Sequence, residues 1–390
     1  MRVAILLESF QPEYWGGRET RWNRLLPVLT QHHQITVFAD FSRVSPTNAF
    51  PDCESVQYID IGPLPPMYKV SGNRSLKHAL LFSTRTLFNL NRDFDIVLCD
   101  QTPIISIPLL RFKSLLSRFE LVVVWHEIWD LQTWFRYSKY LGLFGYLLEF
   151  FAVLMSSNIV VPSKRVQVSL NRKKFYSCSK IIPNGVDRVA PFRDPNTFQS
   201  PSPILNLLYV GRIIKHKNCQ TLIKIMEKAN YLGKNWHLTI VGGGPDLNEL
   251  KSSATRLGLS HRISFLANVS SPELEKIYSH SKVFVFPSER EGFGISVSEA
   301  LSRDIPVVIY DYKSNASIDL LSNENWGVKL ADLSVEKWVA AIEHTSSMKS
   351  KSISNEFLLT QESWGEVGEK FVSYLSQFSS PVSLKFRSQD

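Results

Sequence analysis

The sequence predicts an α/β fold in which parallel β-sheets are covered by helices. Short apolar runs alternate with stretches of helical periodicity, the pattern of successive βαβ units. The clearest unit runs from Val283–Phe286 through a glycine-bearing loop and a helix to Pro306–Ile309. Because 390 residues are enough for two domains of ordinary size, we expect two domains.

The composition is that of a folded globular protein. A hydrophobic content of 44% and a charged content of 21% are typical of a folded globular chain. Neither a leader segment nor a run of about 20 uninterrupted apolar residues is evident, so we expect no membrane-spanning helix. The four cysteines form no C-x-x-C or Cys/His pair, which indicates a reducing compartment and no structural zinc. We therefore expect a cytoplasmic protein.

The formal net charge is +8. A net positive charge of this size is typical of proteins that bind nucleic acid, an anionic membrane surface or a phosphorylated substrate. Zinc-finger spacing, an RNP-like aromatic motif and a long basic tail are all lacking, so nucleic acid is the weakest of the three.

In the first half, the first strand ends near Glu8, and further strands are predicted at 35–39, 56–59, 94–99, 121–125, 158–163 and 180–187. Helices are predicted at 18–33 and 76–90. The pair Gly16-Gly17 stands where a helix begins, and His126 follows an apolar strand. Ligands of parallel sheets bind at the carboxyl ends of strands, so both are candidates. A simple tight turn and a structural histidine are the alternatives.

Aromatic residues crowd the stretch 129–155 and are followed by a basic cluster of Lys164, Arg165, Arg172, Lys173 and Lys174. One interpretation is a helix that packs on the sheet with a solvated charged face. The other is a surface within 129–174 that lies on an anionic membrane. We expect peripheral association with the cytoplasmic face of a membrane.

In the second half, strands are predicted at 205–212, 236–241 and 263–269, and helices at 215–232, 271–280, 335–344 and 364–378. The first strand ends in Gly211-Arg212, and Lys217 follows at the start of a helix. Two cations beside unpaired helix amides form a good diphosphate cradle, although solvated charges are the alternative. Gly243 lies in a three-glycine loop after the next strand.

The loop of the clearest βαβ unit reads Glu291-Gly292-Phe293-Gly294, and Glu299 follows in the helix. Glycines allow close backbone approach, unpaired amides suit an anion, and carboxylates accept hydrogen bonds from sugar hydroxyls. These features favour a binding site for an anionic ligand with several hydroxyls. The alternative is that both glutamates are merely solvated surface residues.

The sequence E-G-F-G-x-x-x-x-E-A resembles the donor-site motif of retaining, nucleotide-sugar-dependent glycosyltransferases of family four, which have the GT-B fold. The spacing G-R-x-x-x-x-K and the early glycine pair also resemble that family, and the resemblance covers nearly the whole chain. It implies two Rossmann-like domains facing across a cleft, at 1–190 and 204–363. A linker at 191–203 joins them, and the C-terminal helix within 364–390 crosses back to the first domain.

The resemblance also implies roles for the candidate residues. Arg212 and Lys217 would neutralise the departing diphosphate, and Glu299 would bind the ribose. Glu291 with the amides of Phe293 and Gly294 would hold the sugar, completed by His126 and the Gly16-Gly17 loop. The implied catalytic residues are Glu291, His126, Arg212 and Lys217; the implied donor-binding residues are Gly16, Gly17, Gly211, Arg212, Lys217, Gly243, Glu291, Gly292, Phe293, Gly294 and Glu299.

No metal or other cofactor is expected. The implied partners are a nucleotide-sugar donor, such as a UDP- or GDP-sugar, and a glycan or lipid-linked acceptor. A sugar-nucleotide epimerase and a non-catalytic nucleotide-sugar binding module on the same fold are the alternatives. The base, the sugar and the acceptor stay open.

Overall fold

A computed structural model describes residues 1–12, 16–53, 55–68, 74–91, 93–137, 139–173, 179–188, 204–267, 269–348 and 353–379. The chain divides into two compact units. Unit 1 comprises Met1–Gly185 and Trp364–Asp390, and unit 2 comprises Val186–Ser363. The predicted linker at 191–203 lies outside the described residues, as do Lys174 and Cys178.

Unit 1 is built on a parallel seven-stranded sheet in the order β3-β2-β1-β4-β5-β6-β7. The strands are β1 Arg2–Leu6, β2 Gln34–Ala39, β3 Gln57–Asp60, β4 Ile96–Asp100, β5 Glu120–Val124, β6 Asn158–Val161 and β7 Ser179–Ile181. The helices are α1 Gly17–Leu29, α2 Pro46–Ala49, α3 Leu76–Asn89, α4 Ser106–Ser117, α5 Leu131–Tyr137, α6 Gly142–Met155, α7 Lys164–Asn171 and α14 Trp364–Ser376, followed by the 3-10 turn η4 Gln377–Ser379.

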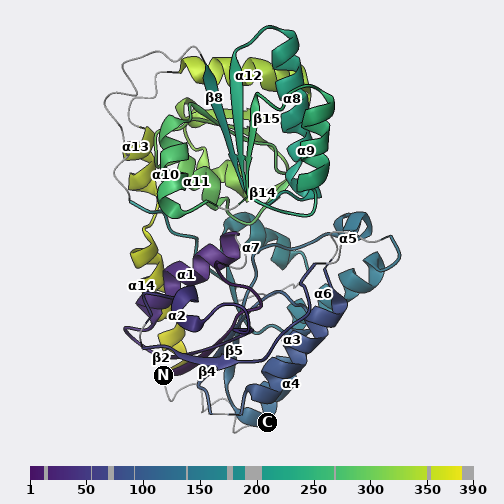
Figure 1. Ribbon diagram of the computed structural model, residues 1–390. Helices are drawn as coiled ribbons and strands as arrows, with labels where there is room; N and C mark the ends of the chain where they lie inside the picture. The colour runs from purple at the N-terminus through teal and green to yellow at the C-terminus, as the bar shows by residue number, and fades with distance from the viewer. Residues whose placement is uncertain are drawn as a thin grey trace. The chain divides into compact units, whose positions relative to one another are not determined.

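The last helix of the chain belongs to unit 1. Helix α14 packs against α1 (Figure 1), and Gly368 allows the close approach: a Cβ there would lie 2.7 Å from Cγ1 of Val28. The rings of Trp22 and Phe371 meet edge to face at 6.2 Å. The return of the C-terminal helix, implied by the resemblance, is thus confirmed.

Unit 2 contains a parallel six-stranded sheet in the order β10-β9-β8-β11-β13-β15, beside a two-stranded pair, β12-β14. The strands are β8 Leu205–Val210, β9 Trp236–Val241, β10 Ile263–Leu266, β11 Val283–Phe286, β12 Arg290–Glu291, β13 Val307–Tyr310, β14 Ser314–Asn315 and β15 Gly327–Leu330. The helices are α8 Cys219–Tyr231, α9 Leu247–Arg256, α10 Ser271–His280, α11 Ile295–Leu301, α12 Val335–Ser347 and α13 Ile353–Thr360, with 3-10 turns η1 Lys215–Lys217, η2 Ala316–Leu320 and η3 Glu324–Trp326.

The predicted fold class is confirmed in both units, including the parallel pairing of β11 with β13 around the central βαβ unit. Some elements differ. The helix predicted at 215–232 begins as a 3-10 turn, because Asn218 adopts a left-handed conformation with φ 51° before α8. The aromatic stretch forms two helices, α5 and α6, and helices α2, α4 and α13 were not predicted.

Candidate active site

In unit 2, the loops after β8 and β9 approach each other through glycines. A Cβ at Gly242 would lie 2.1 Å from the carbonyl oxygen of Gly211, and one at Gly244 would lie 2.2 Å from that of Ile213. Both glycines also have positive φ, so the close backbone approach and the backbone conformation each require a residue without a Cβ. Around Gly243, by contrast, nothing lies within 4 Å of the Cβ position, so the predicted donor-binding glycine borders open space.

Lys217 and Glu291, predicted from motifs 74 residues apart, are in direct contact. The ammonium of Lys217 forms an ion pair with the Glu291 carboxylate and donates to the backbone oxygen of Arg290 at 3.3 Å. Their side chains are only 12% and 14% exposed. The structure therefore joins the predicted diphosphate cation to the predicted sugar-binding carboxylate.

Three cations lie near His216. Burial, together with the positive charges of Lys217, Arg290 and Arg212, holds the pKa of His216 well below its usual range. Arg212, although exposed, therefore lies close enough to act on the same imidazole as Lys217. Arg290 was not predicted as a site residue. Its position next to Glu291, in the segment after β11, could have identified it.

The Glu291–Gly294 loop is held by buried contacts. Gly294 has φ 99°, and a Cβ there would lie 2.1 Å from Cβ of Ser317. The fully buried Asn315 donates to the backbone oxygens of Ser288, at 3.0 Å, and Tyr310, at 2.9 Å. The side chain of Phe293 is buried in the unit 2 core.

Glu299 lies on α11 and contacts a residue that the motif does not include. Its Oε2 accepts a hydrogen bond of 2.8 Å from the hydroxyl of Tyr278, which is 1% exposed on α10. Arg303 stacks on the Tyr278 ring, 4.8 Å from its centroid, and donates to the backbone oxygen of Glu299. Burial raises the pKa of Glu299, whereas Arg303 and the Tyr278 hydroxyl counteract that rise.

In unit 1, the predicted Gly16-Gly17 pair forms the start of α1, with Gly16 at the N-cap. The next residue, Arg18, bonds to Glu19, Ser9 and Thr102 and forms an ion pair with Glu8 at 3.3 Å. Burial by itself raises the pKa of Glu8, but Arg74 and Arg18 bring it below its usual range. The ends of β1 and α1 are thereby joined by a buried charge network.

His126 is where the sequence places it, two residues after the end of β5, and its side chain is 20% exposed. Its Nε2 lies 2.8 Å from Oδ1 of Asp100, the last residue of the neighbouring strand β4. Asp100 is buried and also accepts a hydrogen bond of 3.0 Å from the Trp22 indole. Asp100 was not among the predicted site residues, although it too ends an apolar strand.

One prediction for the segment 129–174, the exposure of Lys173, is wrong. Lys173, predicted to lie on a basic surface, is buried and forms an ion pair with Glu149 of α6. Glu149 also accepts hydrogen bonds of 3.0 Å from the Trp129 amide and the Trp134 indole. This polar cluster fixes α5 on α6, because each member would be costly to bury alone.

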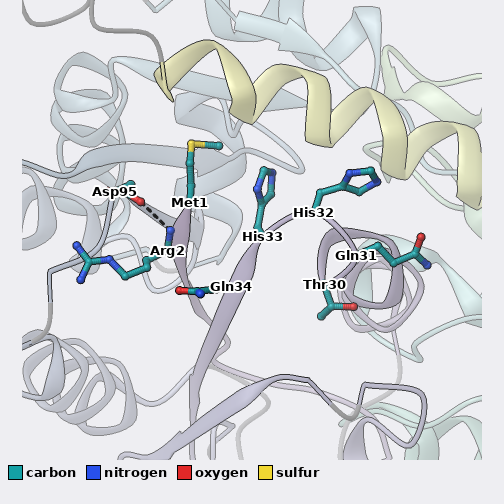
Figure 2. Close-up of a pocket in the computed structure, with 8 residues that line it drawn as sticks. All are labelled: Met1, Arg2, Thr30, Gln31, His32, His33, Gln34 and Asp95. Atoms are coloured by element: carbon teal, nitrogen blue, oxygen red, sulfur yellow. Dashed lines mark hydrogen bonds between the residues drawn. The ribbon is translucent and has the colours of Figure 1, made fainter.

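A cavity of about 590 Å³ lies at the amino ends of the unit 1 strands, away from the predicted residues (Figure 2). Within it, the Arg2 amide donates to Oδ2 of Asp95 at 2.7 Å. Its lining residues are Met1, Arg2, Thr30, Gln31, His32, His33, Gln34 and Asp95.

Two family models match consecutive parts of the chain. Residues 15–189 match "Glycosyltransferase Family 4", and residues 193–354 match "Glycosyl transferases group 1". An uncharacterized glycosyltransferase of Methanocaldococcus jannaschii is 36% identical over 103 residues, 26% of each chain. Alpha-monoglucosyldiacylglycerol synthase of Streptococcus pneumoniae is 26% identical over 220 residues, 51% of this chain and 49% of the relative. The chain thus spans less than half the length of the curated relatives it matches first.

Solved structures share the fold. Sucrose-phosphate synthase from Thermosynechococcus elongatus superposes with a TM-score of 0.76 at 15% identity, covering 96% of this chain and 98% of that one. HepE from Anabaena, solved in complex with UDP-glucose, gives a TM-score of 0.72 at 15% identity, with coverages of 97% and 100%. At this identity the likeness shows a common GT-B architecture.

Proposed function

The chain belongs to the glycosyltransferases of family 4, and from this premise we propose that it transfers a sugar from a nucleoside-diphosphate sugar to an acceptor hydroxyl. The observation that carries the proposal is the contact between Lys217 and Glu291, next to His216, whose pKa is lowered by the nearby cations Arg212, Lys217 and Arg290. A diphosphate develops negative charge as it leaves the sugar, and preorganised cations stabilise that charge.

We assign the diphosphate to Arg212 and Lys217. A nucleotide that reaches Lys217 would compete with Glu291 for the ammonium, which would release the carboxylate to accept hydrogen bonds from the sugar. Supporting this, the Lys217–Glu291 pair retains some exposure, so a ligand can reach it. The open space beside Gly243 is the proposed place of approach for the nucleotide.

Glu299 is the proposed ribose ligand, because the Tyr278 hydroxyl holds one carboxylate oxygen in a defined orientation. Two groups of unit 1 are proposed for the sugar. One is His126, which follows β5 and is held by Asp100 of β4, and the other is the Gly16-Gly17 start of α1. We propose transfer with retention at the anomeric carbon and without a required metal or other cofactor, as the family resemblance implies.

The proposed acceptor is a lipid-linked glycan or another glycoconjugate, presented at the cytoplasmic face of a membrane. The lipid product named by the matched pneumococcal synthase supports an acceptor of this class. Among the described residues, no helix is long and apolar enough to cross a membrane. We also propose an anionic membrane surface as a peripheral partner, because exposed basic side chains such as Lys164 and Arg172 attract anionic headgroups.

The test is binding and slow hydrolysis of UDP-, GDP- and ADP-sugars by the purified protein, with Glu299→Ala and Arg212→Ala alongside. We expect one donor to be bound and hydrolysed by the wild type. Glu299→Ala should lose affinity, and Arg212→Ala should mainly lose kcat, because leaving-group stabilisation belongs to the transition state. A donor converted to an isomeric nucleotide sugar would indicate an epimerase, and binding without turnover in the presence of acceptors would indicate a binding module.

A further inference from the structure

Three helices of unit 1 share an exposed apolar surface. Helix α4 contacts α3 on one side and α6 on the other, so the three form a continuous layer (Figure 1). Large apolar side chains project from this layer into solvent. We call them the three-helix face: Leu76, Leu80 and Phe88 of α3, Phe112, Leu115 and Leu116 of α4, and Leu143, Phe144, Leu147, Phe151 and Leu154 of α6.

The exposure of these residues is large. Phe88 is 73% exposed, Leu116 85%, and Phe144 64%. On α6 the exposed positions recur at helical spacing, while Ala152 and Val153 of the same helix are completely buried. Helix α6 is thus apolar on both its core side and its outer side, which a helix needing only to cover a sheet does not require. Monomers rarely leave a patch of this size uncovered.

The charges on the layer have one sign. Among all residues of α3, α4 and α6, which the structure describes completely, Glu149 is the only carboxylate, and it is buried against Lys173. Cations, in contrast, reach the surface: Lys77 on α3 and Arg118 just after α4 are exposed, and Arg111 is half-buried. Within the three helices, therefore, no acidic side chain is exposed, whereas the loop after α3 carries the exposed Asp93 and Asp95.

We infer that the three-helix face docks on the surface of an anionic lipid bilayer. Apolar side chains enter the boundary between headgroups and acyl chains, and nearby Lys and Arg side chains attract the anionic headgroups. A protein–protein interface is usually bordered by a polar rim, whereas the charged side chains of these three helices are basic where they reach the surface and so complement an anionic one. Docking through this face rests on the membrane contact of the proposed function and extends that contact to α3 and α4, outside the segment 129–174. It does not depend on the donor chemistry.

The experiment is flotation of the full chain with vesicles of phosphatidylcholine containing about one-third phosphatidylglycerol, compared with pure phosphatidylcholine. One variant carries Phe112→Ser and Leu116→Ser on α4, and a second carries Phe144→Ser and Phe151→Ser on α6. The matched control is Leu359→Ser, an 88% exposed leucine on α13 of unit 2. Thermal melting followed by circular dichroism establishes that each variant is folded.

We expect the wild type and Leu359→Ser to float with the anionic vesicles, and each paired variant to partition at least about tenfold less. If the α4 variant binds the vesicles as well as the wild type, the three-helix face is not the docking surface. If the wild type stays with the buffer, docking on the bilayer is refuted altogether. A second copy of the chain would be the occupant if sedimentation velocity showed a dimer that the paired variants dissociate, without vesicle binding. Donor hydrolysis, assayed on the same samples, should be unchanged, so failure of docking and failure of the proposed function are distinguishable.

Discussion

Replacing Tyr278 with phenylalanine is expected to weaken nucleotide binding, although Tyr278 is itself 1% exposed. The substitution keeps the ring that packs near Phe284 and Arg303 and removes only the hydroxyl that donates to Glu299 at 2.8 Å. A hydrogen bond to a charged group contributes about 1.5–3 kcal/mol. If about 1–2 kcal/mol of this serves to orient Glu299 for ribose, affinity falls by about 5- to 30-fold.

The same substitution has a distinctive pH dependence. Burial raises the pKa of Glu299, and the Tyr278 hydroxyl is one of the groups that limit the rise. Without the hydroxyl the pKa rises further. Because the carboxylate is present above its pKa and is lost as the pH falls through it, Tyr278→Phe should lose nucleotide binding at a higher pH than the wild type.

The assay is isothermal titration with UDP, GDP and ADP between about pH 5 and pH 8, the range that spans a raised carboxyl pKa. Tyr231→Phe is the matched control, because Tyr231 is 82% exposed on α8 and its hydroxyl is not part of the site. Equal affinity for wild type and Tyr278→Phe at every pH would refute the positioning role of Tyr278. Absence of wild-type binding to all three nucleotides would instead count against the proposed function.

Three further substitutions test separate parts of the structure. Lys217→Ala should lower kcat by about 10²–10³-fold, because it removes a cation from the leaving diphosphate. Asp100→Asn should lower kcat and alter its pH profile while leaving nucleotide affinity unchanged, because Asp100 is the hydrogen-bond partner of His126. Lys173→Met should reduce the free energy of unfolding by about 3–5 kcal/mol, because it leaves the Glu149 carboxylate buried without its ammonium partner.

Each substitution has a comparison of its own. Turnover of Lys217→Ala equal to that of Lys215→Ala, an exposed neighbour, would remove Lys217 from the diphosphate site. An unaltered pH profile in Asp100→Asn would reduce Asp100 to a structural residue. Urea unfolding of Lys173→Met is compared with Lys164→Met, whose ammonium is exposed, and equal midpoints would contradict the importance of the buried pair.

Features whose causes are local in the sequence were predicted well. Helix α10 has the predicted bounds, since Ser270 and Glu273 form a reciprocal capping box at its start. The strand, loop and helix around Glu291 and Gly294 were also recognised, because apolar runs and glycines act over a few neighbouring residues. These local patterns were enough to predict the parallel α/β class.

Tertiary structure decided which side chains meet. Tyr278 reaches Glu299 from another helix, and Asp100 reaches His126 because β4 and β5 are neighbours in the sheet. Periodicity likewise predicts an apolar stripe on a helix but not whether the core or solvent receives it, so the exposed faces of α3 and α4 could not be foreseen. Local patterns specify elements, whereas contacts between elements depend on strand order and helix packing, which the residues of one element do not encode.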